Sequence, residues 1–179
     1  MKFLETKLKG AYVVELEKRE DDRGFFARTW CKNELEAIGL NASAVQMNMS
    51  RSNKIGTLRG MHYQALPFGE TKLIRVTKGK VFDVIIDLRP ESETYKQWFG
   101  VELSDENYKM LFVPEMFAHG FVTLTDDVEV TYLVTQFYTP EAERAVRYND
   151  PQFAIVWPVP ITSVSDKDAN VEDYMEEIK

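Results

Sequence analysis

Two histidines, the only ones in the chain, lie in two short and compositionally unusual segments. His62 lies within Leu58–Gln64 and His119 within Phe117–Phe121. Histidine is the side chain that titrates closest to neutral pH, so it serves readily as a general base or as a metal ligand. The two segments therefore predict a functional site and leave both kinds of chemistry open.

A base at His62 needs partners of particular types. A neutral imidazole can remove a proton from a carbon beside a ketone when a cation or donor meets the enolate oxygen and a carboxylate orients the ring. Lys72, on the strand that follows, is the candidate cation. Tyr132 is the candidate acid that returns a proton on the opposite face. A solvated lysine and a core tyrosine bonded to backbone explain the same two residues.

A metal site of the cupin kind is the alternative for the histidines. His62 follows Gly56 by six residues and His119 follows Pro114 by five, which resembles the spacing of the two cupin motifs. Gln64 stands where a second histidine is expected, and Glu70 lies out of register for the carboxylate. The set is a poor one for iron, manganese or zinc. A metal-dependent dioxygenase using His62, His119 and Glu70 stays as the second hypothesis.

Two arginines give a further indication of a ligand. Arg23 lies beside Phe25 and Phe26, and Arg59 precedes Gly60, which lets a ligand or backbone approach closely. Guanidinium groups suit a diphosphate, and Phe26 could cover a base or sugar. Surface ion pairs explain the same residues equally well. A binding module without catalysis is the third hypothesis.

Composition limits the class of protein. The chain has 179 residues, a net charge of −7 and one cysteine, Cys31. The length predicts a single domain over residues 1–179, with 169–179 as a loose tail. The acidic balance argues against nucleic acid as the main partner, and no apolar run is long enough for a membrane span. The lone cysteine favours a reducing compartment, so we expect a cytoplasmic protein.

Short segments in which apolar and polar residues alternate, separated by turn residues, predict the strands that position these side chains. They are typical of an antiparallel sandwich or barrel. One helix is expected over 34–38, with Asn33 as N-cap and Gly39 beyond its end, and a second short helix is expected before the C-terminus. The expected strands are 11–17, 71–76, 81–88, 98–103, 128–134 and 154–157.

Side-chain alternation assigns these residues to faces. His62 shares a face with Leu58 and Gln64, and Arg59 lies on the other face. Tyr132 points to an apolar interior. On strand 81–88 both faces must be covered, and Asp83 is expected to line a polar cavity because an unpaired buried carboxylate is costly.

Taken together, these segments resemble the dTDP-4-dehydrorhamnose 3,5-epimerases of nucleotide-sugar metabolism. The similarity runs in family order from about residue 5 to residue 168 with nearly unchanged spacing. The matching runs are 22–26, Gln46 with Asn48 and Ser50, 58–64, 72–76, 79–89, Pro114 with 117–121, Tyr132, Tyr138 with Pro140, 149–151, 157–158 and 165–168.

The resemblance implies an all-β, cupin-type jelly roll or β-sandwich with a few short helices. It implies an isomerase that works without cofactor or metal, as a homodimer that exchanges N-terminal strands. His62 would be the base at C3 and C5, Asp168 its orienting carboxylate, Tyr132 the acid and Lys72 the cation at the C4 enolate oxygen. For Asp168 to act, the chain from Trp157 must fold back to His62, so residues up to about 168 must be ordered.

The resemblance also implies how a nucleotide-diphosphate sugar is bound. Arg23 and Phe26 would contact the nucleotide across the dimer. The remaining substrate-binding candidates are Gln46, Asn48, Arg59, Asp83, His119, Tyr138 and Lys167.

Departures from the family pattern bear on the substrate. Arg28 replaces a common glutamate associated with the nucleobase, and Glu70-Thr71 replaces Gln-Gly. The expected reaction converts dTDP-4-dehydro-6-deoxyglucose to dTDP-4-dehydro-L-rhamnose by deprotonation and reprotonation. A CDP- or GDP-linked sugar, or inversion at C3 or C5 alone, stays open.

Overall fold

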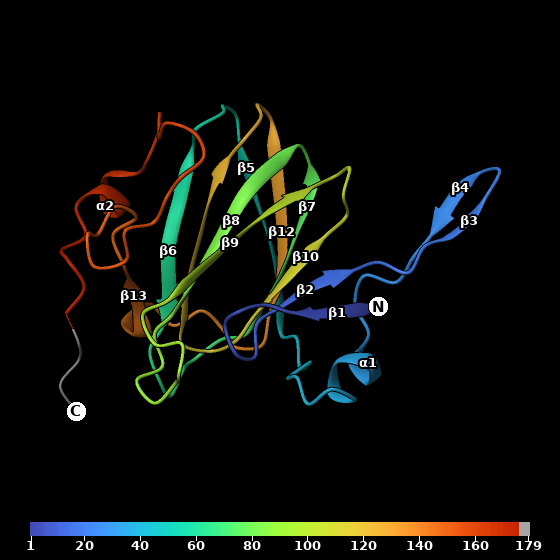
Figure 1. The fold of residues 1–179 in the computed structure, drawn as a ribbon, viewed down its shortest axis with the longest axis horizontal. Helices are drawn as coiled ribbons and strands as arrows, with labels where there is room; N and C mark the ends of the chain where they lie inside the picture. The colour runs from blue at the N-terminus through green and yellow to red at the C-terminus, as the bar shows by residue number, and fades with distance from the viewer. Residues whose placement is uncertain (176–179) are drawn as a thin grey trace.

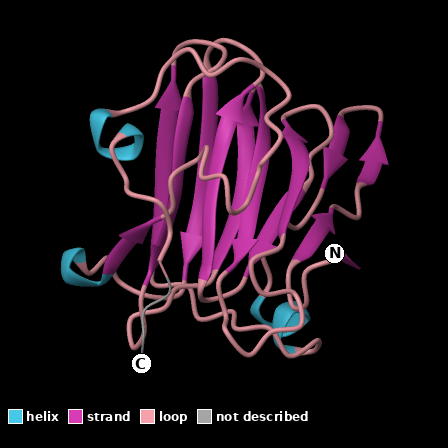
Figure 2. Ribbon diagram, turned by 60° about the vertical axis from the view of Figure 1, so that its left-hand side comes forward, coloured by secondary structure: helices cyan, strands magenta, loops and turns pink. Residues whose placement is uncertain are grey.

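Two antiparallel sheets packed face to face make up most of the molecule (Figures 1 and 2). The description rests on a computed structural model and covers residues 1–175. In spatial order, the first sheet contains β1 (Lys2–Glu5), β2 (Tyr12–Glu15), β10 (Met110–Val113), β7 (Lys72–Lys78), β12 (Val128–Val134) and β5 (Gln46–Ser52). The second contains β13 (Glu143–Ala145), β6 (Leu58–Gln64), β11 (Phe117–Thr123), β8 (Lys80–Asp87) and β9 (Trp98–Ser104).

Apolar side chains from both sheets fill the space between them. Ile74 and Val130 of the six-stranded sheet pack with Val81, Ile85 and Phe121 of the five-stranded sheet. Because strand residues alternate between faces, each strand sends every second side chain into this core. The expected all-β, cupin-type sandwich is confirmed.

The outer face of the five-stranded sheet is covered by the C-terminal part of the chain. Val84 and Ile86 point to this side and pack with Phe153, Trp157 and other apolar residues. Residues 154–157 were predicted as a strand, but they form no regular element. Their apolar side chains cover the sheet. An alternation of apolar and polar residues does not by itself distinguish such a covering segment from a strand.

Helices are few and short, and each lies at the margin of the sandwich. Helix α1 (Lys32–Glu36) begins two residues earlier than predicted, after Cys31, and Asn33 is not its cap. Its Leu35 is buried against the outer side of the six-stranded sheet, and this packing fixes the helix. Helix α2 (Asp166–Ala169) is the expected second helix, and η1 (Pro140–Ala142) is a single 3-10 turn.

A two-stranded hairpin projects from the sandwich. Strands β3 (Arg19–Asp21) and β4 (Gly24–Phe26) pair only with each other and lie far out on the β1 side of the molecule (Figure 1). All six residues of the two strands are exposed. An isolated hairpin this small has little stability of its own.

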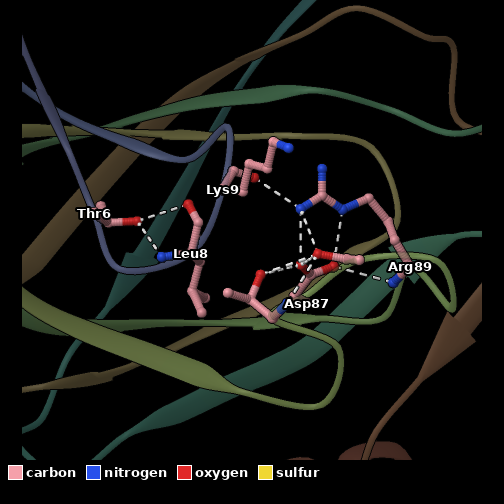
Figure 3. Close-up of polar contacts among 7 residues, drawn as sticks. Thr6, Leu8, Lys9, Asp87 and Arg89 are labelled. Atoms are coloured by element: carbon pink, nitrogen blue, oxygen red, sulfur yellow. Dashed lines mark hydrogen bonds and ion pairs between the residues drawn. The ribbon is translucent and has the colours of Figure 1, made fainter.

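One buried ion pair joins the end of β8 to the loop after β1. The Asp87 carboxylate is fully buried and accepts hydrogen bonds from Arg89, Ser92 and Thr94 (Figure 3). The Arg89 guanidinium also donates to the Lys9 carbonyl at 2.7 Å. Burial acts to raise the pKa of Asp87, but the hydrogen bonds outweigh burial and lower that pKa.

Candidate active site

A cavity of about 780 Å³ opens between the two sheets, and both of them supply its walls. Its size and its mixture of apolar and polar side chains are typical of a small-molecule site. The residues around it are Gln46, Asn48, Ser50, Thr57, Leu58, Arg59, His62, Tyr63, Gln64, Glu70, Lys72, His119, Phe121, Tyr132, Val134, Tyr138, Glu143, Ser163, Val164, Ser165, Lys167 and Asp168.

The two histidines are direct neighbours on the five-stranded sheet. His62 on β6 pairs in register with His119 on β11. Gly60 makes this pairing possible, because a Cβ there would lie 2.6 Å from the Gly120 Cα and from the His119 carbonyl oxygen. Its φ of +113° also lies in the region that favours glycine.

Asp168 reaches His62 from the C-terminal segment. The Leu58 N–H donates to the Ser163 carbonyl at 2.8 Å, which ties this segment to the start of β6. Ser165 caps α2, with its Oγ 3.1 Å from the Asp168 N. The Asp168 Oδ1 then lies 2.7 Å from the His62 Nε2, and α2 contacts β6 as Figure 1 shows.

The second histidine has its own carboxylate. Both oxygens of Asp83 lie 3.0 Å from the His119 Nε2. Asp83 was expected to line the cavity, but it is fully buried in the sheet behind His119 and is not part of the lining. The buried carboxylate is therefore paired with a histidine of the cavity wall.

The opposite wall carries the candidate cation and acid. Lys72 begins β7, and its Nζ donates to the His62 carbonyl at 3.3 Å and lies 3.0 Å from the Glu70 Oε1. Tyr132 on β12 is paired with Ile74 and Asn48. Burial raises the pKa of the Tyr132 phenol, as does the charge of Glu70, while Arg59 acts in the other direction. A phenol with a raised pKa stays protonated over a wider pH range.

A cluster of three polar side chains forms part of the cavity rim. Glu143 accepts a hydrogen bond from the Lys167 ammonium at 2.7 Å and from the Tyr138 hydroxyl at 3.0 Å. Burial acts to raise the pKa of Glu143, but these bonds lower it overall. The bond to Glu143 in turn raises the pKa of both Lys167 and Tyr138.

Charge is balanced around the described lining. Three cationic side chains, Arg59, Lys72 and Lys167, face three carboxylates. The two lysines are each paired with a glutamate. Arg59 instead donates to neutral oxygens, the Ser52 Oγ at 3.0 Å and the Arg51 carbonyl at 2.8 Å. Arg59 is thus the cation whose charge is available to an anionic ligand.

Most of the predicted site residues are brought together in this cavity. Arg59 lines it although alternation places Arg59 on the face opposite His62. The cause is the register shift between β6 and β11 at Gly60, which breaks strict alternation. The predicted residues around the cavity are Gln46, Asn48, Arg59, His62, Lys72, His119, Tyr132, Tyr138, Lys167 and Asp168.

Arg23 and Phe26 do not line the cavity of their own chain. Both belong to the projecting hairpin, where the Arg23 side chain is 89% exposed and Phe26 is 68% exposed. Arg23 is paired with Asp21 at 2.6 Å. If these two residues contact substrate, it must be substrate bound to another copy of the chain.

Several cavity residues were not among the predicted site residues. Gln64 shares the alternation face of His62, and its side chain bonds to Phe68, Phe137 and Thr139. From the sequence, Gln64 can be identified only as a polar residue on an inward face. Its hydrogen-bond partners cannot be predicted. No sequence pattern indicates that Glu143 belongs to the cavity, because its position depends on the pairing of β13 with β6.

The donors proposed for a metal centre are engaged elsewhere. Glu70 pairs with Lys72, and each histidine pairs with its own aspartate. Within residues 1–175, no group of three or more histidine, cysteine, aspartate or glutamate side chains is arranged to hold a metal ion. No helix in that part of the chain is long and apolar enough to cross a membrane.

Known proteins resemble the chain over nearly its whole length. The family model for dTDP-4-dehydrorhamnose 3,5-epimerase matches residues 5–176. An epimerase of that name from Pseudomonas aeruginosa is 46% identical, over 90% of this chain and 92% of its own. A dTDP-4-dehydrorhamnose 3-epimerase from Streptomyces niveus is 35% identical, over 94% of this chain and 83% of its own.

Solved structures agree with this assignment. The crystal structure of dTDP-4-dehydrorhamnose 3,5-epimerase from Bacillus anthracis, with TDP and PPi bound, superimposes with a TM-score of 0.93. It is 43% identical and covers 97% of this chain and 99% of its own. With the two-walled cavity, these matches lead to one conclusion: the chain belongs to the dTDP-4-dehydrorhamnose 3,5-epimerase family.

Proposed function

We propose that the protein inverts C3 and C5 of dTDP-4-dehydro-6-deoxyglucose and so produces dTDP-4-dehydro-L-rhamnose. The observation that supports this most strongly is the division of the cavity. A histidine held by a carboxylate belongs to one sheet, while a tyrosine and a lysine belong to the other. Inversion needs a base and an acid on opposite faces of the sugar, and the sandwich supplies one on each wall.

Proton removal falls to His62. The bond between Asp168 and Nε2 favours the tautomer that carries its proton on Nε2, which leaves the Nδ1 lone pair as the base. His62 takes the proton from the carbon beside the C4 ketone, and the electron pair moves to the C4 oxygen. Lys72 donates a hydrogen bond to that oxygen and stabilises its charge.

Proton return falls to Tyr132. Its raised pKa keeps the phenol protonated, as an acid requires. The phenol gives its proton to the carbon from the face opposite His62, and the C4 ketone re-forms. The tyrosinate and the imidazolium then exchange protons with solvent before the second carbon reacts, so no cofactor enters the balance.

Binding of the nucleotide diphosphate is assigned to polar groups around this centre. Arg59 supplies an unmatched positive charge for the diphosphate. The Ser50 hydroxyl is buried and has no hydrogen-bond partner among the described residues, so a substrate group can satisfy it. Gln46, Asn48, Tyr138, His119 and Lys167 complete the proposed binding set, with Asp83 acting through His119.

A homodimer accounts for the projecting hairpin. One chain's cavity lining has no net charge from its lysine, arginine and carboxylate side chains, whereas a diphosphate carries at least two negative charges. A partner's hairpin that places Arg23 and Phe26 at the cavity supplies cation and aromatic cover together. Exposed Phe26, with Met47 and Met49 on β5, is also consistent with burial between subunits. We also propose that the protein is located in the cytoplasm. The single cysteine supports this location, because it cannot form a disulfide within the chain.

Inversion at C3 alone is the second candidate. The similarity to the Streptomyces niveus 3-epimerase favours it, since that protein covers nearly the whole chain. Both reactions use the same base and acid, so the lining residues named above serve either. What differs is whether the sugar can present C5 to the same base.

Nucleobase specificity is the remaining part of the proposal. Arg28, at the position of the common glutamate, forms an ion pair with Glu34 and does not line the described cavity. It therefore gives no contact in a single chain that would select CDP or GDP over dTDP. We retain dTDP as the proposed nucleotide.

Proton NMR in deuterated water tests the function directly. The enzyme is mixed with dTDP-4-dehydro-6-deoxyglucose, and the H3 and H5 signals are followed, with the CDP and GDP analogues in parallel. Loss of both signals with the dTDP sugar supports the 3,5-epimerase. Loss of H3 alone supports the 3-epimerase, and no loss with any nucleotide contradicts the proposal.

A further inference from the structure

One carboxylate of the cavity has no part in the mechanism above. Glu70 lies just before β7, and its side chain is 14% exposed. Its Oε1 is 3.0 Å from the Nζ of Lys72, whose side chain is 9% exposed. Removing a charge from water to this extent is costly unless a partner compensates, so each of these two groups stabilises the other.

This contact fixes the direction of the Lys72 ammonium. The Nζ donates a hydrogen bond to the His62 carbonyl oxygen and forms an ion pair with the Glu70 carboxylate. An ammonium has three N–H groups, so donor capacity remains for a ligand. A lysine side chain held by two contacts loses less conformational freedom when substrate binds than a free one would.

The same carboxylate acts on the wall that holds the acid. Its negative charge favours the protonated form of Tyr132, against the opposite effect of Arg59. The other acids of the cavity are committed to different groups: Asp168 to His62, and Glu143 to Lys167 and Tyr138. His119 is paired with Asp83 behind the wall. Glu70 is thus the carboxylate placed to serve Lys72 and Tyr132.

We propose that Glu70 is a positioning residue of the reaction: it aligns the Lys72 ammonium toward the substrate's C4 oxygen, and its charge acts on Tyr132 across the cavity that both residues line. The inference rests on the proposed function for the roles of Lys72 and Tyr132. Its carboxylate also offsets part of the positive field at the C4 oxygen, which opposes catalysis. The alignment of Lys72 outweighs this loss, so we expect substitution of Glu70 to lower turnover.

A titration without substrate tests the electrostatic part. Protein labelled with 13C at the tyrosine Cζ is titrated by NMR, and the Tyr132 signal is assigned by its absence in Tyr132→Phe. Glu70→Gln, which keeps the shape and removes the charge, lowers the pH at which Tyr132 titrates. Glu143→Gln removes an equal charge from the same cavity and leaves that pH unchanged. An unchanged midpoint in Glu70→Gln overturns the proposal.

Kinetics test the alignment. We expect Glu70→Gln to lower kcat roughly tenfold and to change KM less than about threefold, because alignment matters most as the enolate forms. We expect kcat to fall further in Glu70→Ala, which removes both the charge and the side-chain contact with Lys72, and Glu70→Asp to recover part of the loss. A kcat equal to or above that of the wild type in Glu70→Gln, or a loss entirely in KM, contradicts the proposal.

The two experiments separate this inference from the proposed function. If the wild-type protein exchanges no sugar proton, the proposed function fails, and the role of Glu70 in that reaction fails with it. The titration then still shows whether Glu70 acts on Tyr132. If the wild type is active and Glu70→Gln changes neither the titration nor kcat, only the inference about Glu70 fails.

Discussion

Two histidine–aspartate pairs lie side by side at the cavity wall yet differ in construction. His62 is 33% exposed and its partner Asp168 comes from the C-terminal helix, more than a hundred residues away in sequence. His119 is 11% exposed, and its partner Asp83 is fully buried on the adjacent strand of the same sheet. Both histidines line the cavity, but His62 is the more exposed of the two, and only Asp83 is enclosed in the sheet away from the lining.

This difference separates the roles of two similar groups. A base must reach a carbon of the substrate and exchange its proton with solvent, which exposure allows for His62. His119 is held by two carboxylate oxygens, and in the proposed function it orients the substrate beside the base. The comparison predicts that substitutions in the first pair reduce chemistry and those in the second reduce stability as well.

Removing the exposed base has the largest expected effect. His62→Ala should lower turnover of dTDP-4-dehydro-6-deoxyglucose on the order of 10⁴-fold, because no other group in the proposed mechanism removes the proton. Steady-state assay coupled to product detection measures this. The midpoint of thermal unfolding should stay within a few degrees of the wild-type value. A large loss of stability with intact turnover per folded molecule would argue against the assignment.

Removing the acid distinguishes its role from that of the base, because the substitution removes the proton donor on only one face of the sugar. Tyr132→Phe should lower epimerisation about 10³-fold while solvent exchange at the sugar carbons falls much less. The reason is that His62 still removes protons and returns them to the same face. Parallel measurement of product and of deuterium uptake tests this, and equal loss of both would contradict a pure acid role.

The two carboxylates provide the matched pair of variants. Asp168→Asn should lower kcat about 10²-fold with little change in the unfolding midpoint, since it leaves the ring of an accessible base without its orienting charge. Asp83→Asn should lower kcat only about tenfold but should reduce stability, because it alters a fully buried carboxylate. Kinetics and thermal unfolding of both variants check this; identical profiles would remove the distinction.

The smallest expected effect on activity lies outside the cavity, at Asp87. Its folded-state pKa is lowered, so its stabilising contribution is present above the unfolded pKa of about 4 and is lost as pH falls through the lower folded value. Asp87→Asn should cost about 3 kcal/mol at neutral pH and little activity. Denaturant unfolding from pH 7 downward should show the two proteins converging in acid. A difference in the free energy of unfolding that stays constant as the pH falls would contradict a stabilising role for the Asp87 charge.

Sequence patterns predicted the local features well. Alternation placed both faces of 81–88 in buried surroundings, and Asp83 and Asp87 are both fully buried. The short helix predicted near the C-terminus is present as Asp166–Ala169. These features depend on neighbours in sequence or on one strand's periodicity, which a single chain reveals.

Features that depend on pairing between distant strands were not predictable. Arg59 joins the cavity because of a register shift at Gly60, and Glu143 joins it because β13 pairs with β6. Position in the sequence makes Glu70 a candidate metal ligand, and only its distance to Lys72 shows its partner. Register and pairing of this kind are set by the packed sandwich as a whole.

In the proposed mechanism His62, the more exposed histidine, is the base, and His119 is not. Deuterium uptake at C3 and C5 of dTDP-4-dehydro-6-deoxyglucose, measured by proton NMR for His62→Ala and His119→Ala against the wild type, tests it most directly. We predict no uptake in His62→Ala and slow uptake in His119→Ala. Uptake retained in His62→Ala and lost in His119→Ala would contradict the assignment.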